Sequence, residues 1–210
     1  MPTRRPLRLL LCAALSAGAA GADSLLPNGR FDDATTGTDG WVEVDAFGAI
    51  EWDGTRDADG CGASGAAALV HSGPTGASAA RFASCAPAVP GDTDYRFAAA
   101  FFFPPQDREG DATVEVRFVE GAGCTGAVLA SAISPPALST VENQWVTLSG
   151  SASAPPATGS ALVVVTLTKK VGGSELIAFL DEVELQPDSE LFGDDLEVGA
   201  VCRWSAATTE

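Results

Sequence analysis

The closing part of the sequence contains the stretch FLDEVEL, in which an acidic residue, Asp181, lies in line with apolar ones. Residues two apart in a strand point to the same side. One face of this expected strand therefore holds Ile177, Phe179, Asp181, Val183 and Leu185. It is the more apolar of the two faces, so we expect it to pack inward and to bury Asp181. A buried carboxylate without a partner costs several kcal/mol, so it requires a cation, hydrogen-bond donors or a raised pKa.

Three environments for Asp181 stay open at the level of the sequence. An arginine is one partner, and Arg30, Arg81 or Arg96 could serve. Calcium is another, because it binds carboxylate and carbonyl oxygens from several chain segments. Asp32, near the start, could share that ion if the first and last strands lie side by side. In the third environment Asp181 ends its strand and reaches solvent.

The composition is strongly acidic. The 210 residues include 28 Asp and Glu against 12 Lys and Arg, which gives a net charge of −16. Such a charge repels nucleic acid and anionic membranes, so neither is expected as a partner. The excess of acids suits a secreted soluble protein, or one that collects divalent cations.

The first residues have the pattern of a secretion signal. Basic residues, a short apolar run and a small-residue cleavage pattern follow one another: Arg4, Arg5 and Arg8, then 9–15, then 20–22. We expect residues 1–22 to be a signal peptide and the protein to be extracellular or periplasmic. Membrane insertion is not expected, because no later stretch approaches the roughly 20 apolar residues that a span needs.

Four cysteines follow the expected signal: Cys61, Cys85, Cys124 and Cys202. An even number in an exported chain indicates two disulfides. Zinc is disfavoured, because no two of these cysteines are close in sequence and His71 is the only histidine.

Short alternating runs separated by turn residues dominate the rest of the chain and predict an all-β protein. In TVEVRFVE, for example, Val114, Val116 and Phe118 face one way and Glu115 and Arg117 the other. We expect roughly ten strands in a two-sheet antiparallel β-sandwich, or jelly roll, over residues 23–187. Two of them, GAAALVHS and SAARFAS, are expected to form a hairpin around GPTG. Residues 188–210 form an acidic C-terminal tail in this interpretation.

Several segments resemble the carbohydrate-binding modules of families 4 and 9, found in extracellular bacterial proteins. They are the opening LLPNGRFDD…GTDGW, the close IAFLDEVEL, and between them WDGTRDADGCGASGAAALV, CAPAVPGDTDYRF and QWVTLSGSASAPPATGSALVVV. The resemblance implies a jelly roll with a structural calcium ion held partly by Asp32 and Asp181. The family usually has Glu at the first position, and a second Asp where this chain has Glu182.

The resemblance also bears on the disulfides. The related modules carry cysteines that correspond to Cys85 and Cys124, which favours that pair and leaves Cys61 to pair with Cys202. The alternative is Cys61–Cys85, because these two residues are equidistant from the centre of the expected hairpin near Gly73.

DADG (Asp57, Asp59, Gly60) resembles the start of a helix-loop-helix calcium loop. Such a loop needs Glu at its twelfth position, which here is Ala68. We interpret DADG as a solvated turn.

Candidate ligand-binding residues are aromatic, because an aromatic ring covers the apolar side of a sugar. Trp52 ends a short strand beside a polar run, and Phe101 and Phe103 share one face of AFFFPP, opposite Phe102. Packing against the core is the alternative for Trp52, and is expected for Trp41, Tyr95 and Trp145.

No catalytic motif stands out, so we expect no enzyme. The hypothesis is a secreted, non-catalytic carbohydrate-binding-like module with weak affinity for a polysaccharide or a cell-surface glycan. The alternative is a structural or adhesive module of the envelope or matrix, whose partner is a protein. Two further hypotheses rank below these: an accessory to glycoside hydrolase activity and, last, a small hydrolase.

Overall fold

The structure, a computed structural model, describes residues 24–32, 34–60, 64–75, 79–171 and 175–188. Eleven strands are found there: β1 (Trp41–Glu43), β2 (Gly48–Asp53), β3 (Ala66–His71), β4 (Ala79–Ala86), β5 (Thr93–Phe102), β6 (Glu109–Glu120), β7 (Val128–Ile133), β8 (Ala137–Leu138), β9 (Trp145–Ala154), β10 (Thr158–Val171) and β11 (Leu176–Pro187). The expected signal peptide and almost all of the expected tail lie outside the described residues.

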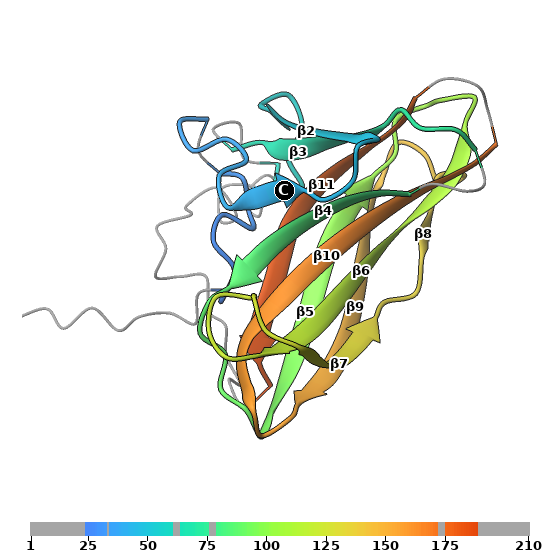
Figure 1. Ribbon diagram of the computed structural model, residues 1–210. Coiled ribbons are helices and arrows are strands. Elements are labelled where there is room, and N and C mark those ends of the chain that lie inside the picture. Colours follow the sequence, from blue (N-terminus) through green and yellow to red (C-terminus); the bar gives the residue numbers. More distant parts are fainter. Residues whose placement is uncertain (1–23, 33, 61–63, 76–78, 172–174, 189–210) are drawn as a thin grey trace, which may run out of the picture.

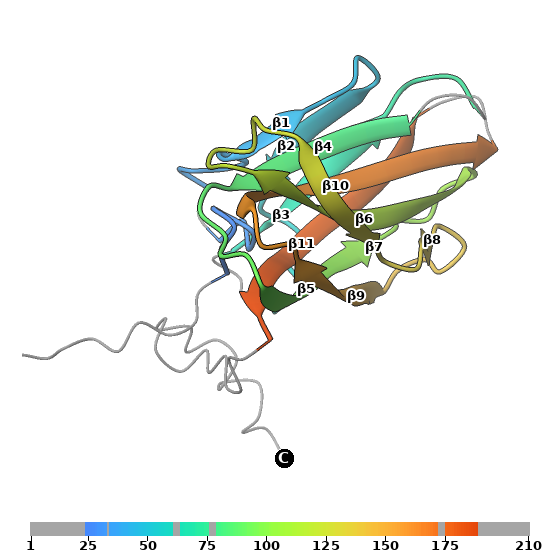
Figure 2. The same ribbon diagram turned by 60° about the horizontal axis from the view of Figure 1, so that its bottom comes forward.

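The strands form two sheets that pack face to face (Figures 1 and 2). The first sheet has the order β1-β4-β10-β6-β7, with β8 also paired to β6, and the second has the order β2-β3-β11-β5-β9. Neighbouring strands within each sheet are antiparallel, as in the pairing of β10 with β6 and of β11 with β5. The predicted all-β, two-sheet β-sandwich is confirmed.

The core lies between the sheets and follows the alternation that the sequence predicts. On β6, Val114, Val116 and Phe118 are buried, while Glu115 and Arg117 keep part of their surface exposed on the outer side. Tyr95 and Trp41 are also buried, as expected, and the Tyr95 hydroxyl donates a hydrogen bond to the carbonyl of Pro90 (2.9 Å). Burying the apolar side of every strand in one layer supplies most of the stabilisation of such a sandwich.

The expected hairpin of GAAALVHS and SAARFAS is wrong. β3 pairs with β2 and β11 in one sheet, whereas β4 pairs with β1 and β10 in the other. The chain therefore passes from one sheet to the other between β3 and β4. A local pattern of two apolar runs around a turn is the same for a hairpin and for such a crossing, so only the long-range pairing distinguishes them.

The segment that opens the domain lies along β11. The Leu25 amide donates to the carbonyl of Leu185 (2.9 Å), and the Val183 amide donates to the carbonyl of Gly29 (2.8 Å). A Cβ atom on Gly29 would lie 2.0 Å from the Val183 carbonyl oxygen, so glycine is required there. The start and the end of the sandwich are therefore adjacent, as the jelly-roll interpretation predicts.

A β-bulge interrupts β11 where Asp181 lies. The pairing with β5 shifts between Asp181 and Glu184, and Glu182 has a positive φ of 48°. Leu176, Ala178 and Leu180 point into the core before the bulge, and Val183 and Leu185 do so after it. The extra residue of a bulge reverses the alternation of the strand. The prediction that Asp181 points into the sandwich is therefore wrong, since it lies on the outer side of its sheet.

Candidate functional site

The outer face of the second sheet carries a groove of about 440 Å³ that crosses β9, β5 and β11. Its lining consists of Arg96, Phe97, Ala98, Ser149, Gly150, Ser151, Glu184 and Gln186. Neighbouring outward positions are Ala98 on β5 and Ser149 on β9, which are direct cross-strand partners. Because these side chains are small, the middle of the sheet forms a floor, while longer polar side chains stand at the sides.

Gly150 shapes this part of the sheet from beneath. It pairs with Phe97 across the two strands, and a Cβ atom on Gly150 would lie 2.4 Å from the Phe97 ring. A larger residue would displace that ring, which is buried in the core. The glycine in LSGSAS therefore leaves room for the Phe97 ring on the core side of the sheet, beneath the groove.

Two ion pairs flank the groove. The Arg96 guanidinium lies 2.9 Å from Asp188, and the Arg30 guanidinium lies 3.6 Å from Glu184. Their side chains are partly exposed, so each pair contributes little to stability. Both pairs hold hydrogen-bonding groups in place beside the hydroxyls of the floor. The groove therefore presents donors and acceptors of both kinds, with its formal charges balanced.

Aromatic rings lie on the same outer face, farther along the strands. Phe102 contacts Trp145 in a tilted arrangement (ring centroids 5.6 Å apart) and Phe179 edge to face (6.1 Å). The guanidinium of Arg56 lies over both phenylalanine rings, 4.3 Å and 4.6 Å from their centroids. Both rings are only 8% exposed. Arg56 therefore covers, through these cation–π contacts, the faces of the two phenylalanine rings on which a sugar ring would stack.

Asp181 is buried between this cluster and the groove, only 1% exposed. One carboxylate oxygen accepts a hydrogen bond from the Ala58 amide (2.9 Å) and the other accepts one from the Glu182 amide (2.7 Å). Burial raises the pKa of Asp181 to about 8, against the lowering effect of the two amides, and the charges of Asp57 and Glu182 raise it further. The turn DADG is thus not simply solvated, because its backbone covers this carboxylate.

The three arginines considered as partners for Asp181 form ion pairs with other acids. Arg30 and Arg96 form the two ion pairs beside the groove, and the Arg81 guanidinium lies 3.5 Å from Asp45. The groups that act on the pKa of Asp181 are the two backbone amides and the two carboxylates named above, together with desolvation. These surroundings favour the protonated form of Asp181, because its pKa is raised to about 8.

The expected calcium ligands, Asp32 and Asp181, lie on adjacent segments. Asp32 follows the opening segment and is exposed, and the Phe31 carbonyl beside it accepts a hydrogen bond from the Trp52 indole (2.9 Å). Among the described residues, no three His, Cys, Asp or Glu side chains are grouped so as to hold a metal ion. A calcium ion at Asp181 would therefore draw further ligands from backbone carbonyls and water, which calcium accepts readily.

The structure places the predicted ligand-binding aromatics away from the groove. Phe101, on β5, and Phe103, just after it, are 0% and 1% exposed and belong to the core, because both point inward. Trp52 packs against the same core, and its ring lies against Gly54 and Gly65. The prediction is therefore wrong for Phe101 and Phe103, whereas Trp52 keeps part of its surface exposed and its role as a ligand contact stays a prediction. The small residues that form the floor of the groove, Ala98 and Ser149, are marked by no motif in the sequence.

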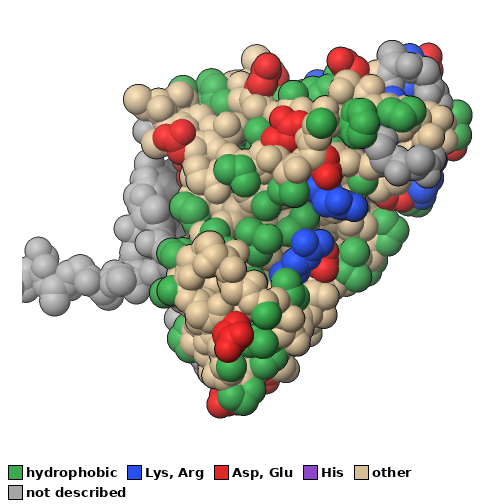
Figure 3. Space-filling view, in the orientation of Figure 1, with side chains coloured by type: hydrophobic (Ala, Val, Ile, Leu, Met, Phe, Trp, Pro, Cys, Tyr) green, Lys and Arg blue, Asp and Glu red, His purple; other side chains and the backbone are tan. Residues whose placement is uncertain are grey.

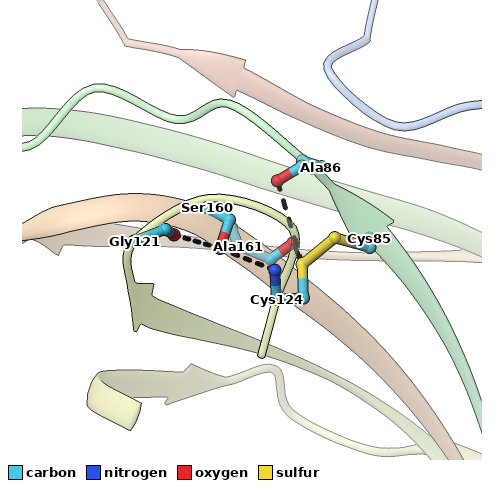
Figure 4. The surroundings of a disulfide bond; sticks show 6 residues. All are labelled: Cys85, Ala86, Gly121, Cys124, Ser160 and Ala161. Carbon is cyan, nitrogen blue, oxygen red and sulfur yellow. Dashed lines mark hydrogen bonds between the residues drawn. A yellow bond between two sulfur atoms is a disulfide. The ribbon is translucent and has the colours of Figure 1, made fainter. Parts of the chain in front are cut away.

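The predicted disulfide between Cys85 and Cys124 is confirmed (Figure 4). It joins β4 to the turn between β6 and β7, with Cα atoms 6.1 Å apart. The Cys124 amide donates to the hydroxyl of Ser160 (2.9 Å), which in turn donates to the carbonyl of Gly121 (2.7 Å). The alternative Cys61–Cys85 bridge is excluded. Cys61 and Cys202 lie outside the described residues.

His71 lies inside the sandwich with no exposed surface, and its Nδ1 accepts a hydrogen bond from the Gly73 amide (3.1 Å). It is therefore remote from the groove.

In the part of the chain that the structure describes, no helix has the length and apolar character needed to cross a membrane.

No protein-family model and no curated protein matches this sequence. Solved structures do match the fold. The enzymatically active domain of tailspike protein 4 from bacteriophage CBA120 has a TM-score of 0.58 and 14% identity over 78% of this chain and 21% of its own. The xylan-binding CBM22-1 domain from Paenibacillus barcinonensis has a TM-score of 0.54 and 15% identity over 80% of this chain and 96% of its own.

A third structure contains the CBM22-1 and GH10 modules of a Clostridium thermocellum xylanase in complex with xylohexaose. It has a TM-score of 0.55 and 11% identity over 76% of this chain. The chain spans only 28% of that protein and about a fifth of the tailspike domain, but nearly all of the Paenibacillus module. The described part of this chain therefore has the fold of the β-sandwich carbohydrate-binding modules.

Proposed function

We propose that this protein binds a neutral polysaccharide, without catalysis, in the groove across β9, β5 and β11. The observation that carries the proposal is the groove itself: an open channel on the outer face of one sheet, with a floor of small side chains and polar side chains at its sides. Its volume lies in the range of small-molecule sites. Structural neighbours that bind xylan or xylohexaose support a glycan as the ligand.

The expected affinity is weak. Hydrogen bonds from serine, glutamine and the ion-paired groups exchange for bonds to water, so each contributes only about 0.5–1.5 kcal/mol. The stacking surface that would add affinity is covered by Arg56. The chain is also strongly acidic, so a polyanionic polysaccharide would be repelled. A neutral polymer such as xylan fits these conditions best.

Filling the groove tests the proposal. Ser149→Trp places a large ring on the exposed floor, and we expect it to lower the affinity for xylohexaose by about tenfold or more. Thr113→Trp, on the outer face of the other sheet, is the matched control and should bind as the unchanged protein does. Calorimetric titration with xylohexaose, and retention in gels that contain xylan, measure the effect.

Two results would overturn this assignment. One is a folded protein that no neutral polysaccharide retains. The other is Ser149→Trp with the affinity of the unchanged protein, since that places binding elsewhere.

We further propose a structural calcium ion at Asp181, with Asp32 as a second ligand. The desolvated carboxylate and the neighbouring charges of Asp57 and Glu182 support it, because a divalent cation would offset most of their combined negative charge. The negative charge of these acidic residues is thus suited to a bound cation. Calcium would supply no chemistry there, and it would fix the opening segment and the 54–60 turn against β11.

Calcium should raise the melting temperature of the protein above that in a chelator by several degrees, because it binds only the folded state. Asp181→Asn and Asp32→Asn should each reduce that gain. Asp92→Asn is the matched control, since Asp92 is an exposed residue with positive φ that asparagine tolerates. Scanning calorimetry measures the gain. Equal gains in all variants, or none in the unchanged protein, would eliminate the site.

We propose that the protein works outside the cytoplasm. The Cys85–Cys124 bridge supports this, because such bonds persist in oxidising compartments. The basic and apolar start of the chain supports it as well.

A further inference from the structure

We propose that Arg56 binds the carboxylate of a uronic acid side group on an otherwise neutral polysaccharide, and thereby makes the groove selective for that substituent. This inference rests on the proposed function, because it adds a contact for the same ligand. Its evidence is the position of Arg56 on the outer face of the second sheet, together with the partners of the other arginines.

Arg56 differs in its partners from the other arginines of the described chain. Those five all form ion pairs with Asp or Glu: Arg30, Arg81, Arg96, Arg108 and Arg117. Figure 3 shows the same arrangement on one face of the molecule, where the blue side chains near the middle lie against red ones. Among the described residues Arg56 forms no ion pair, and its guanidinium lies over two aromatic rings instead. In a chain with 28 acids, that leaves one cation open to an external carboxylate.

The acids of the turn that carries Arg56 are bonded to the backbone of that turn. The Asp53 carboxylate accepts a hydrogen bond from the Thr55 amide (2.7 Å), and the Asp57 carboxylate accepts one from the Asp59 amide (3.1 Å). Such local bonds are what Asp side chains commonly form in turns. A cation–π contact uses the flat face of a guanidinium, so the N–H groups along the edge of Arg56 stay available to a ligand.

The two rings hold Arg56 in place before a ligand arrives. The guanidinium lies 4.3 Å from the centroid of Phe102 and 4.6 Å from that of Phe179, and the side chain keeps part of its surface exposed. Because the side chain is already restricted, less rotamer entropy is lost when it binds. The planar guanidinium also matches a carboxylate, with two parallel N–H···O bonds. Arg56 is therefore preorganised for a carboxylate.

The groove leads towards Arg56 along the strands. Ala98 in the groove and Phe102 beneath Arg56 are outward positions of β5 that are four residues apart, or about 13 Å. On the neighbouring strand β9, the exposed side chains of Thr147 and Ser149 occupy the same interval. A polysaccharide that lies in the groove and continues along these two strands therefore brings a side group to Arg56.

Charge decides how many acidic groups the ligand can carry. The net charge of −16 repels a polymer with a carboxylate on every unit. At physiological ionic strength, charges more than about 8 Å apart are largely screened, so an isolated carboxylate responds mainly to its nearest groups. Asp181 is buried, and its oxygens accept two amide hydrogen bonds, which keeps it from the ligand. A neutral main chain with occasional uronate side groups fits these conditions.

Calorimetric titration of the full-length protein with matched ligands tests the proposal. The neutral ligand is xylohexaose, and the acidic ligands are a series of the same length with one glucuronic acid side group at each position in turn. We expect the best acidic ligand to bind about tenfold more tightly than xylohexaose. Reduction of its carboxyl group to the alcohol should remove this preference, and 1 M NaCl should weaken it because the interaction is between charges.

Variants of Arg56 assign the preference to this residue. Arg56→Gln should abolish it, while the affinity for xylohexaose stays the same or rises, because the groove is intact and the rings are less covered. Arg56→Lys keeps the charge without the planar fork and should retain only part of the preference. Arg81→Gln is the matched control, since it removes the same charge from β4 in the first sheet and should retain the full preference.

Three results would count against the inference. Equal affinity of the unchanged protein for xylohexaose and for every acidic ligand would overturn it and leave the proposed function standing. So would a folded Arg56→Gln variant that keeps the preference. Failure of all these ligands to bind would overturn the proposed function and this inference with it.

Discussion

Raising the pH from about 5 to about 9 in the presence of a chelator should lower the free energy of unfolding steeply, because Asp181 loses a proton that stabilises the folded state. Its carboxyl has a pKa of about 8 in the folded protein and an ordinary value of 3.8. Between these values the folded state holds one proton more than the unfolded state. The contribution of this group is therefore complete below about pH 4 and is lost as the pH rises through 8, at up to about 1.4 kcal/mol per pH unit.

Other carboxylates also titrate, so the comparison with Asp181→Asn isolates this one. Asparagine keeps an acceptor for one of the two amides and turns a donor toward the other, which costs about 1–3 kcal/mol at every pH. The variant should be less stable than the unchanged protein at pH 5, and the two curves should approach each other towards pH 9. Urea unfolding across this range measures both. Parallel curves would show that Asp181 does not carry the proton.

Calcium should reverse this dependence if it binds Asp181. Calcium binds the ionised form of the carboxylate, so the stabilising effect of calcium should grow as the pH rises. The chelator and calcium curves should then diverge above about pH 6. Identical slopes with and without calcium would leave the proton, and not the metal, as the partner of Asp181.

Removing the Cys85–Cys124 bridge should lower the free energy of unfolding by about 3–4 kcal/mol. The two residues are 39 positions apart, and a closed loop of that size restricts the unfolded chain by about this amount. The double variant Cys85→Ala, Cys124→Ala prevents the bridge, and urea unfolding under oxidising conditions measures the loss.

The bridge also fixes the turn that leads into β7, so its loss should destabilise β7 more than the rest of the sheet. Hydrogen exchange should quicken first at the amides of β7 that bond to β6, before those in the middle of β10. Reduction of the unchanged protein is the matched treatment and should give the same pattern. A double variant as stable as the unchanged protein, with β7 equally protected, would contradict the prediction.

The sequence determined those features that depend on local alternation or on short motifs. On β6, Val114, Val116 and Phe118 alternate with Glu115 and Arg117, and a strand buried on one face has only one way to satisfy that pattern. The opening motif follows similar logic, because Gly29 is the residue that can approach Val183 closely. The all-β class and the adjacency of the first and last segments of the sandwich were therefore predictable, and the Cys85–Cys124 pair followed from the resemblance.

The tertiary structure alone decided where the polar features lie. The bulge after Asp181 moved this carboxylate from the core to the outer face, and a bulge leaves no mark in a pattern that reads as unbroken alternation. Phe101 and Phe103 point inward and Phe102 outward because of the register of β5 with its neighbours. The groove exists because Ala98 and Ser149, 51 positions apart in the sequence, are brought side by side by strand pairing. Small side chains carry no signal of their own, and only long-range strand pairing turns them into a site.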